Sequence, residues 1–138
     1  MTKEHQLRIV SMLGLPAEIR GCELGVGTYV TMRVSRGDLW VTASSWLITD
    51  GDSVLAGSED DRTEMAAALE RFVGRELQSV SFERSPDIDI LASGGLALRL
   101  FQDTAAADAT PVSIRSERQR LYAHWGGHVS ETGSTDGE

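Results

Sequence analysis

The segment that decides the fold is YVTMRVSRGDLWVTASSWLITDGDSVLAG, residues 29–57. At its start Val30, Met32 and Val34 alternate with more polar residues. Successive side chains of an extended chain point to opposite faces of a sheet, so this period of two predicts a strand with one buried and one exposed face.

The rest of this segment indicates two further strands joined by turns. Residues 39–48 are rich in β-branched and aromatic side chains, which favours a second strand with a bend at its central serine pair. SRGD (35–38) precedes it as a turn, and TDGD (49–52) follows it with the Asp-Gly pair of a two-residue hairpin. A returning strand over 53–57 completes an antiparallel meander.

A clear amphipathic helix follows, at about 60–73. Ser58 or Asp60 can cap it, and Gly74 provides the left-handed stop. Its apolar side chains recur every three or four residues, which predicts a helix that packs on a sheet: Met65, Ala68, Leu69, Phe72 and Val73. A shorter helix is also indicated at 3–13, with its inward side chains Leu7, Val10 and Met12 or Leu13.

Further strands are predicted at 77–83, 87–92 and 96–101, and the two halves of the chain resemble each other. GCEL (21–24) matches GREL (74–77), and GDLWVTA (37–43) matches GGLALRL (94–100). We therefore predict an α+β fold with a mainly antiparallel sheet, built from two similar β-meanders with one central helix packed on it. This internal similarity is also compatible with a homodimer.

The length of 138 residues suits one domain with its own core. Extended segments at 111–115 and 120–125 are expected to end this domain, which we place at 1–125. Residues 126–138 are polar, acidic and rich in glycine, so we expect a disordered acidic tail there.

Composition narrows the partners and the compartment. A formal net charge of −8 argues against nucleic acid and anionic membrane, because both require clustered cations. The one local basic cluster, Arg115, Arg118 and Arg120, is diluted by Glu117. The sequence shows neither a secretory signal nor the ~20 apolar residues of a membrane span, so we expect a cytoplasmic protein. The single cysteine, Cys22, is expected in the core.

Two histidines are the main candidates for a metal site. His124 and His128 lie four positions apart in YAHWGGHVSE (122–131). The two glycines between them disfavour a helix by about 1 kcal/mol each, and on one strand the histidines would be ~13 Å apart. Only a turn at the glycines could join them. We therefore expect no metal and no cofactor.

Catalytic patterns are sparse elsewhere in the chain. Asp87 and Asp89 alternate with isoleucines, which places both carboxylates on one strand face. Further acids at the spacing of a calcium loop do not accompany them, so a solvated outer face is favoured over a cation site. We therefore expect a protein without catalytic activity.

The segment from the second tryptophan to the helix start is the best candidate for a binding surface. Acidic residues are concentrated there, and an exposed tryptophan beside them would anchor a partner. The predicted partner-binding residues are Trp46, Asp50, Asp52, Glu59, Asp60 and Asp61.

Several of these motifs resemble a loosely defined family of small, uncharacterised bacterial cytoplasmic proteins, some of them immunity-like proteins of toxin systems. The motifs that carry the resemblance span residues 13–101: LGLP (13–16), the GTYVTMRV strand, SSWLI (44–48), VLAGSEDD (54–61) and LALRLF (96–101). These motifs are structural, so the resemblance assigns no catalytic residues to this chain. The family usually has a tryptophan soon after its second meander. Here Trp125 follows an alanine-rich insertion, so the correspondence stops before the C-terminal part.

Three functions therefore compete. The resemblance and the acidity favour an immunity-like protein that binds a basic protein such as a toxin domain. The alternatives are a small metal-dependent enzyme that uses His124 and His128, and an oligomeric structural accessory domain.

Overall fold

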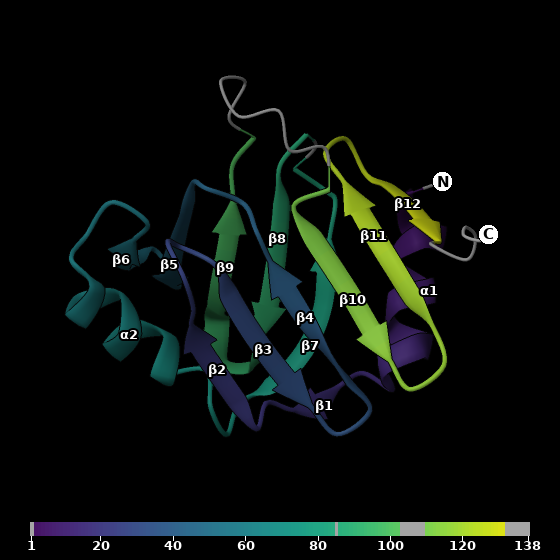
Figure 1. The fold of residues 1–138 in the computed structure, drawn as a ribbon, viewed down its shortest axis with the longest axis horizontal. Coiled ribbons are helices and arrows are strands. Elements are labelled where there is room, and N and C mark those ends of the chain that lie inside the picture. Colours follow the sequence, from purple (N-terminus) through teal and green to yellow (C-terminus); the bar gives the residue numbers. More distant parts are fainter. Residues whose placement is uncertain (1, 85, 103–109, 132–138) are drawn as a thin grey trace.

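The computed structural model describes residues 2–84, 86–102 and 110–131, which form two facing antiparallel sheets (Figure 1). Sheet A has the strand order β1 (Ala17–Glu18), β7 (Glu76–Ser81), β8 (Ile88–Ala92), β9 (Leu96–Leu100), β5 (Trp46–Asp50) and β6 (Ser53–Gly57). Sheet B has the order β12 (His128–Glu131), β11 (Arg120–His124), β10 (Val112–Ser116), β4 (Gly37–Val41), β3 (Val30–Val34) and β2 (Gly21–Leu24). A short 3-10 turn, η1 (Ser93–Gly95), joins β8 to β9. The α+β class with mainly antiparallel sheet is confirmed.

The two halves of the chain complete each other's sheets. Strands β2, β3 and β4 are neighbours in sheet B, and β7, β8 and β9 are neighbours in sheet A. After β4 the chain crosses to sheet A, where β5 pairs with β9. After β9 it crosses back, and β10 pairs with β4. The prediction of one sheet built from two meanders is met only in part, because each sheet takes strands from both halves.

The predicted single strand over 39–48 is wrong, because its two ends belong to different sheets. The backbone N–H of Thr42 donates to Pro111 O beside sheet B, whereas Ser45 O accepts from the N–H of Phe101 beside sheet A. The crossover therefore falls within the small and polar residues 42–45. As a consequence Trp40 is partly exposed on sheet B, whereas Trp46 is buried between the sheets.

In the described part of the chain two helices lie at the open sides of the sandwich (Figure 1). The helices predicted at 3–13 and at about 60–73 are both present, but the second lies at a side of the sandwich and not centrally on one sheet. Helix α1 (Thr2–Leu13) packs on β7, β10 and β12, and buries Ile9 and Leu13. Leu7, predicted to face inward, is 60% exposed.

Helix α2 (Arg62–Glu70) packs on β2 and β6. Asp61, and not Ser58 or Asp60, caps it by accepting from the N–H of Glu64 at 3.0 Å. The helix ends before Val73, which therefore leaves the apolar face and is exposed.

The C-terminal part is more ordered than the sequence predicted. Residues 128–131 form β12, which pairs with β11 through a turn at Gly126 and Gly127, both with φ of 90°. The expected disordered tail is therefore wrong for residues 126–131, and 132–138 lie outside the described residues. The domain extends at least to Glu131. Glycine at both turn positions explains the difference, because a positive φ costs glycine little.

Candidate functional site

Sheet A turns one face toward the apolar core and the other away from it. On the outward face the strand register places Leu47 of β5 beside Arg99 of β9, and Arg99 beside Asp89 of β8. Arg99 and Asp89 are opposite charges on directly paired positions, which is a favourable cross-strand contact. The outward face therefore carries charged groups in the middle of the sheet.

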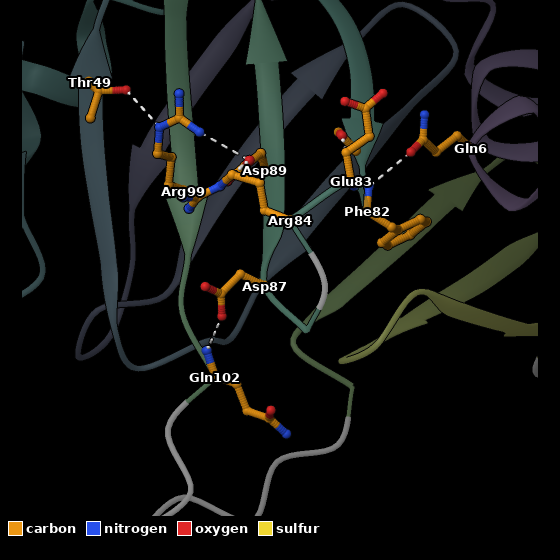
Figure 2. Close-up of polar contacts among 10 residues, drawn as sticks. Gln6, Thr49, Phe82, Glu83, Arg84, Asp87, Asp89, Arg99 and Gln102 are labelled. Carbon is orange, nitrogen blue, oxygen red and sulfur yellow. Dashed lines mark hydrogen bonds and ion pairs between the residues drawn. The ribbon is translucent and has the colours of Figure 1, made fainter. Parts of the chain in front are cut away.

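Asp89 is the centre of a group that we call the arginine cluster, Arg84, Asp89 and Arg99 (Figure 2). Its Oδ2 accepts from Arg84 Nε at 2.9 Å and from Arg99 Nη1 at 3.0 Å, while Arg99 Nε donates to Thr49 Oγ1 at 3.2 Å. The Asp89 side chain is only 5% exposed, and its Oδ1 is buried with no hydrogen-bond partner among the described residues. Two guanidinium groups around one carboxylate leave an excess positive charge at this point.

The predicted solvated outer face is wrong for Asp89, which is buried, whereas Asp87 is partly exposed. Asp87 precedes β8 and accepts from the N–H of Gln102 at 3.0 Å (Figure 2). Asp89 is buried because the two arginine side chains cover it. The two carboxylates thus have separate hydrogen-bond partners.

A pocket of about 430 Å³ adjoins the arginine cluster. We call it the Phe101 pocket, and its lining residues are 45–47, 54, 57–60 and 101. The Arg84 guanidinium lies 5.9 Å from the centre of the Phe101 ring, so this ring borders both features. Val54, on the outer strand β6, is 61% exposed. The pocket therefore combines apolar walls with a partly open edge.

The structure divides the six predicted partner-binding residues. Trp46, Glu59 and Asp60 line the Phe101 pocket. Trp46 is only 1% exposed, and its Nε1–H donates to Thr28 O at 2.9 Å, so the exposure that an anchor residue requires is absent. The strand alternation that gives β5 a buried face places this side chain inward.

The other three acidic residues have separate surroundings. Asp50 forms an ion pair with Arg71 at 3.1 Å, Asp52 is exposed in the turn between β5 and β6, and Asp61 caps α2. Asp50 lies at the opposite end of β5 from the Phe101 pocket, about 13 Å away along the strand. The acidic segment therefore does not form one patch.

The histidines are brought together by the turn at Gly126 and Gly127, the one arrangement that could join them. The two-glycine turn pairs His124 directly with His128, and their ring centroids lie 5.0 Å apart. His5 of α1 joins them, 5.7 Å from His128. Its Nδ1 lies 2.8 Å from Gly127 O, and His124 Nε2 lies 2.7 Å from Ser130 Oγ.

This histidine cluster ties α1 to the β11–β12 hairpin, together with an ion pair between Arg8 and Glu131. Across the residues that the structure describes, no group of three or more histidine, cysteine or acidic side chains is arranged to hold a metal ion. The contacts of His5 and of Arg8 join α1 to this hairpin. We take the Phe101 pocket as the candidate site.

No helix in the described part of the chain has both the length and the apolar character needed to cross a membrane. Comparison with protein-family models, curated proteins and solved structures finds no match to this chain.

Proposed function

We propose that this protein is a non-catalytic binding domain, immunity-like in its action, whose Phe101 pocket receives a basic and partly apolar segment of a partner protein. The observation that carries the proposal is the pocket itself, with apolar walls and two carboxylates at its edge. The net charge of −8 supports it, because an acidic protein attracts basic partners and speeds their association.

The two carboxylates have different roles at the pocket. Asp60 Oδ2 accepts from the N–H of Gly57 at 2.7 Å, which fixes the loop between β6 and α2. Glu59 is exposed and has no hydrogen bond or ion pair within the described residues. Glu59 can therefore meet a cationic group without first breaking another contact.

The walls suit the stem of a lysine or arginine side chain. Leu47 and Phe101 are half-buried, and Val54 is exposed beside them. Long basic side chains pack their methylene groups on apolar surface while the charged end stays in contact with polar groups. One basic side chain would thus contact the walls with its stem and Glu59 with its head.

The arginine cluster adds selectivity to this pocket. Arg84 lies over Phe101, so a second cation placed on that side would be repelled. An acidic residue there would be attracted. We therefore expect the preferred segment to carry one basic residue for the pocket and no basic residue on the side of Arg84.

The test is a titration of the isotope-labelled protein with two short peptides, monitored by NMR. The two peptides are identical except that one contains Leu-Arg where the other contains Leu-Glu. The Leu-Arg peptide should shift the amide signals of Leu47, Val54 and Phe101, and added salt should weaken its binding. The double variant Glu59→Gln with Asp60→Asn should weaken binding by about tenfold, which corresponds to one charge-assisted contact.

The matched control is Asp50→Asn with Asp52→Asn, which removes the same charge at the other end of the same hairpin. It should leave the affinity nearly unchanged. Equal weakening by both double variants would show that only overall charge matters. That outcome, or equal shifts with both peptides, would contradict a role for the pocket.

A further inference from the structure

A second cavity lies at the end of sheet B, away from the Phe101 pocket. Because β4 and β10 are neighbours, the turn between β3 and β4 lies beside the turn between β10 and β11 (Figure 1). Met12, residues 33–38 and residues 116–119 line a cavity of about 730 Å³ between them. We call it the hairpin-end cavity.

The charge of this cavity is opposite to that of the whole chain. Three arginines line it, and one of them, Arg33, forms an ion pair with Glu23 at 2.9 Å. Arg36 and Arg118 make no hydrogen bond or ion pair with other described residues. Two guanidinium groups are therefore free to bind a ligand.

The carboxylates of the cavity do not cancel this charge. Asp38 accepts from Arg115 Nε at 3.0 Å and is thereby neutralised. Glu117, exposed in the turn, is then the remaining acidic group of the lining. Arg36 and Arg118 together exceed it by one positive charge, in a chain whose formal net charge is −8.

The walls are held in place before any ligand arrives. A Cβ built on Gly37 would lie 1.9 Å from Arg115 O, so β4 and β10 approach backbone to backbone here and only glycine fits. Ser116 closes the second turn, with its N–H donating to Gln119 O at 2.9 Å and its Oγ accepting from the N–H of Gln119 at 3.3 Å. Walls that need no reordering lose less entropy when a ligand binds.

We propose that the hairpin-end cavity binds a small molecule that carries a phosphate group, held by Arg36 and Arg118. Guanidinium groups bind oxyanions through paired N–H donors, and a phosphate offers oxygens to two such groups at once. The cavity volume falls within the range of small-molecule sites, about 300–1,000 Å³. Met12 and Val34 supply apolar contact for the rest of the ligand.

The test uses glycerol 3-phosphate and inorganic phosphate as probes and glycerol as the blank, titrated at constant ionic strength and followed by NMR. Both phosphates should give saturable shifts at residues 35–38 and 116–119, and glycerol should give none. Tighter binding of glycerol 3-phosphate than of inorganic phosphate would support an organic phosphate as the ligand, and equal binding would overturn that part of the proposal.

Substitutions of single arginines then test which side chains hold the phosphate group. Arg36→Gln and Arg118→Gln should each weaken binding by about tenfold. Arg71→Gln makes the same charge change at an arginine that pairs with Asp50 and does not line the cavity, and it should weaken binding by less than about twofold. Each variant's thermal midpoint is measured, and all three side chains are exposed enough that folding should persist. Shifts that do not saturate, equal weakening by all three variants, or tighter binding of a single-stranded oligonucleotide would overturn the proposal.

Discussion

Asp89 is a buried carboxylate at a strand position that alternation assigns to the outward face. Its neighbours Ile88 and Ile90 point into the core, as the period of two requires. Arg84 and Arg99 cover it from the outer side and supply its charge partners. The position is stable only because both guanidinium groups neutralise a charge that would otherwise be costly to bury.

Asp89→Asn should therefore lower the free energy of unfolding by about 2 kcal/mol. The figure is below that of a fully buried pair because both arginines are partly exposed to solvent, which screens them. Urea denaturation at pH 7 measures the change. Asp87→Asn is the control, because the amide oxygen still accepts from Gln102 N–H, and it should cost less than about 0.5 kcal/mol. Equal loss in both variants would contradict the role of the arginine cluster.

Cys22 provides a second test at a single residue. Burial raises the pKa of its thiol from the ordinary value of 9.0 to about 12, and the nearby Glu23 carboxylate adds to the increase. Only the thiolate reacts quickly with disulfide reagents. Labelling at pH 8 should therefore be no faster than unfolding of the protein, and urea should accelerate it. Rapid labelling of the folded protein at pH 8 would contradict this burial.

The same pKa fixes how Cys22 affects stability. The folded state holds the proton more tightly than the unfolded state. Its contribution to stability is fully present below pH 9 and is lost as the pH rises from about 9 toward 12. Between pH 6 and 8 the thiol is protonated in both states, so Cys22 should cause no change of stability with pH in that range.

Individual strands follow from local alternation, whereas their pairing does not. The strands predicted at 29–34, 53–57 and 96–101 are confirmed as β3, β6 and β9. The first and the third follow from side chains two positions apart, and the second follows from the Asp-Gly turn before it. The exchange of strands between sheets depends on contacts such as Val41 with Val112, which are distant in the sequence. Nothing in residues 39–48 alone indicates that two sheets will divide them.

The candidate site, too, could be predicted from the sequence only where its residues are close together in the chain. Glu59 and Asp60 could be predicted near Trp46 because they follow it closely in the sequence, but the burial of that tryptophan depends on the second sheet. The sequence patterns considered above did not predict the arginine cluster, although the register of one hairpin indicates it. A hairpin closed by the turn at 93–95 places residue 89 opposite residue 99, and this register alone pairs Asp89 with Arg99.

Helix α1 offers a direct test of which face packs on the sheets. Leu13→Ala should lower the free energy of unfolding by about 3 kcal/mol, because Leu13 is fully buried. Leu7→Ala makes a related truncation at an exposed position of the same helix and should change it by less than about 0.5 kcal/mol. Urea denaturation measures both. A larger loss for Leu7→Ala than for Leu13→Ala would reverse the packing described for this helix.

The two halves of the chain are interlocked, so we expect the whole domain to fold and unfold as one cooperative unit. Hairpin β5–β6 of the first half completes sheet A, and β10, β11 and β12 of the second half complete sheet B. All the apolar residues between the sheets form one core. Neither half holds a sheet that is complete without the other.

Fragments 1–57 and 58–138 should therefore be unfolded when separate and folded when mixed in equal amounts. In the first fragment β4 lacks β10 and β5 lacks β9, so both sheets lose a central pairing. Circular dichroism and NMR of each fragment and of the mixture measure this. A mixture whose spectrum equals the sum of the separate fragments would contradict the interlocked core, as would a folded fragment alone.

The late position of β10 in the chain has a consequence for biosynthesis. A ribosome releases the chain from its N-terminus, so β4 emerges with β3 on one side and an unpaired edge on the other until β10 follows. An exposed strand edge can pair with other chains. The growing polypeptide should thus depend on chaperones or rapid elongation until its last hairpin appears, and slow translation should favour aggregation of the nascent protein.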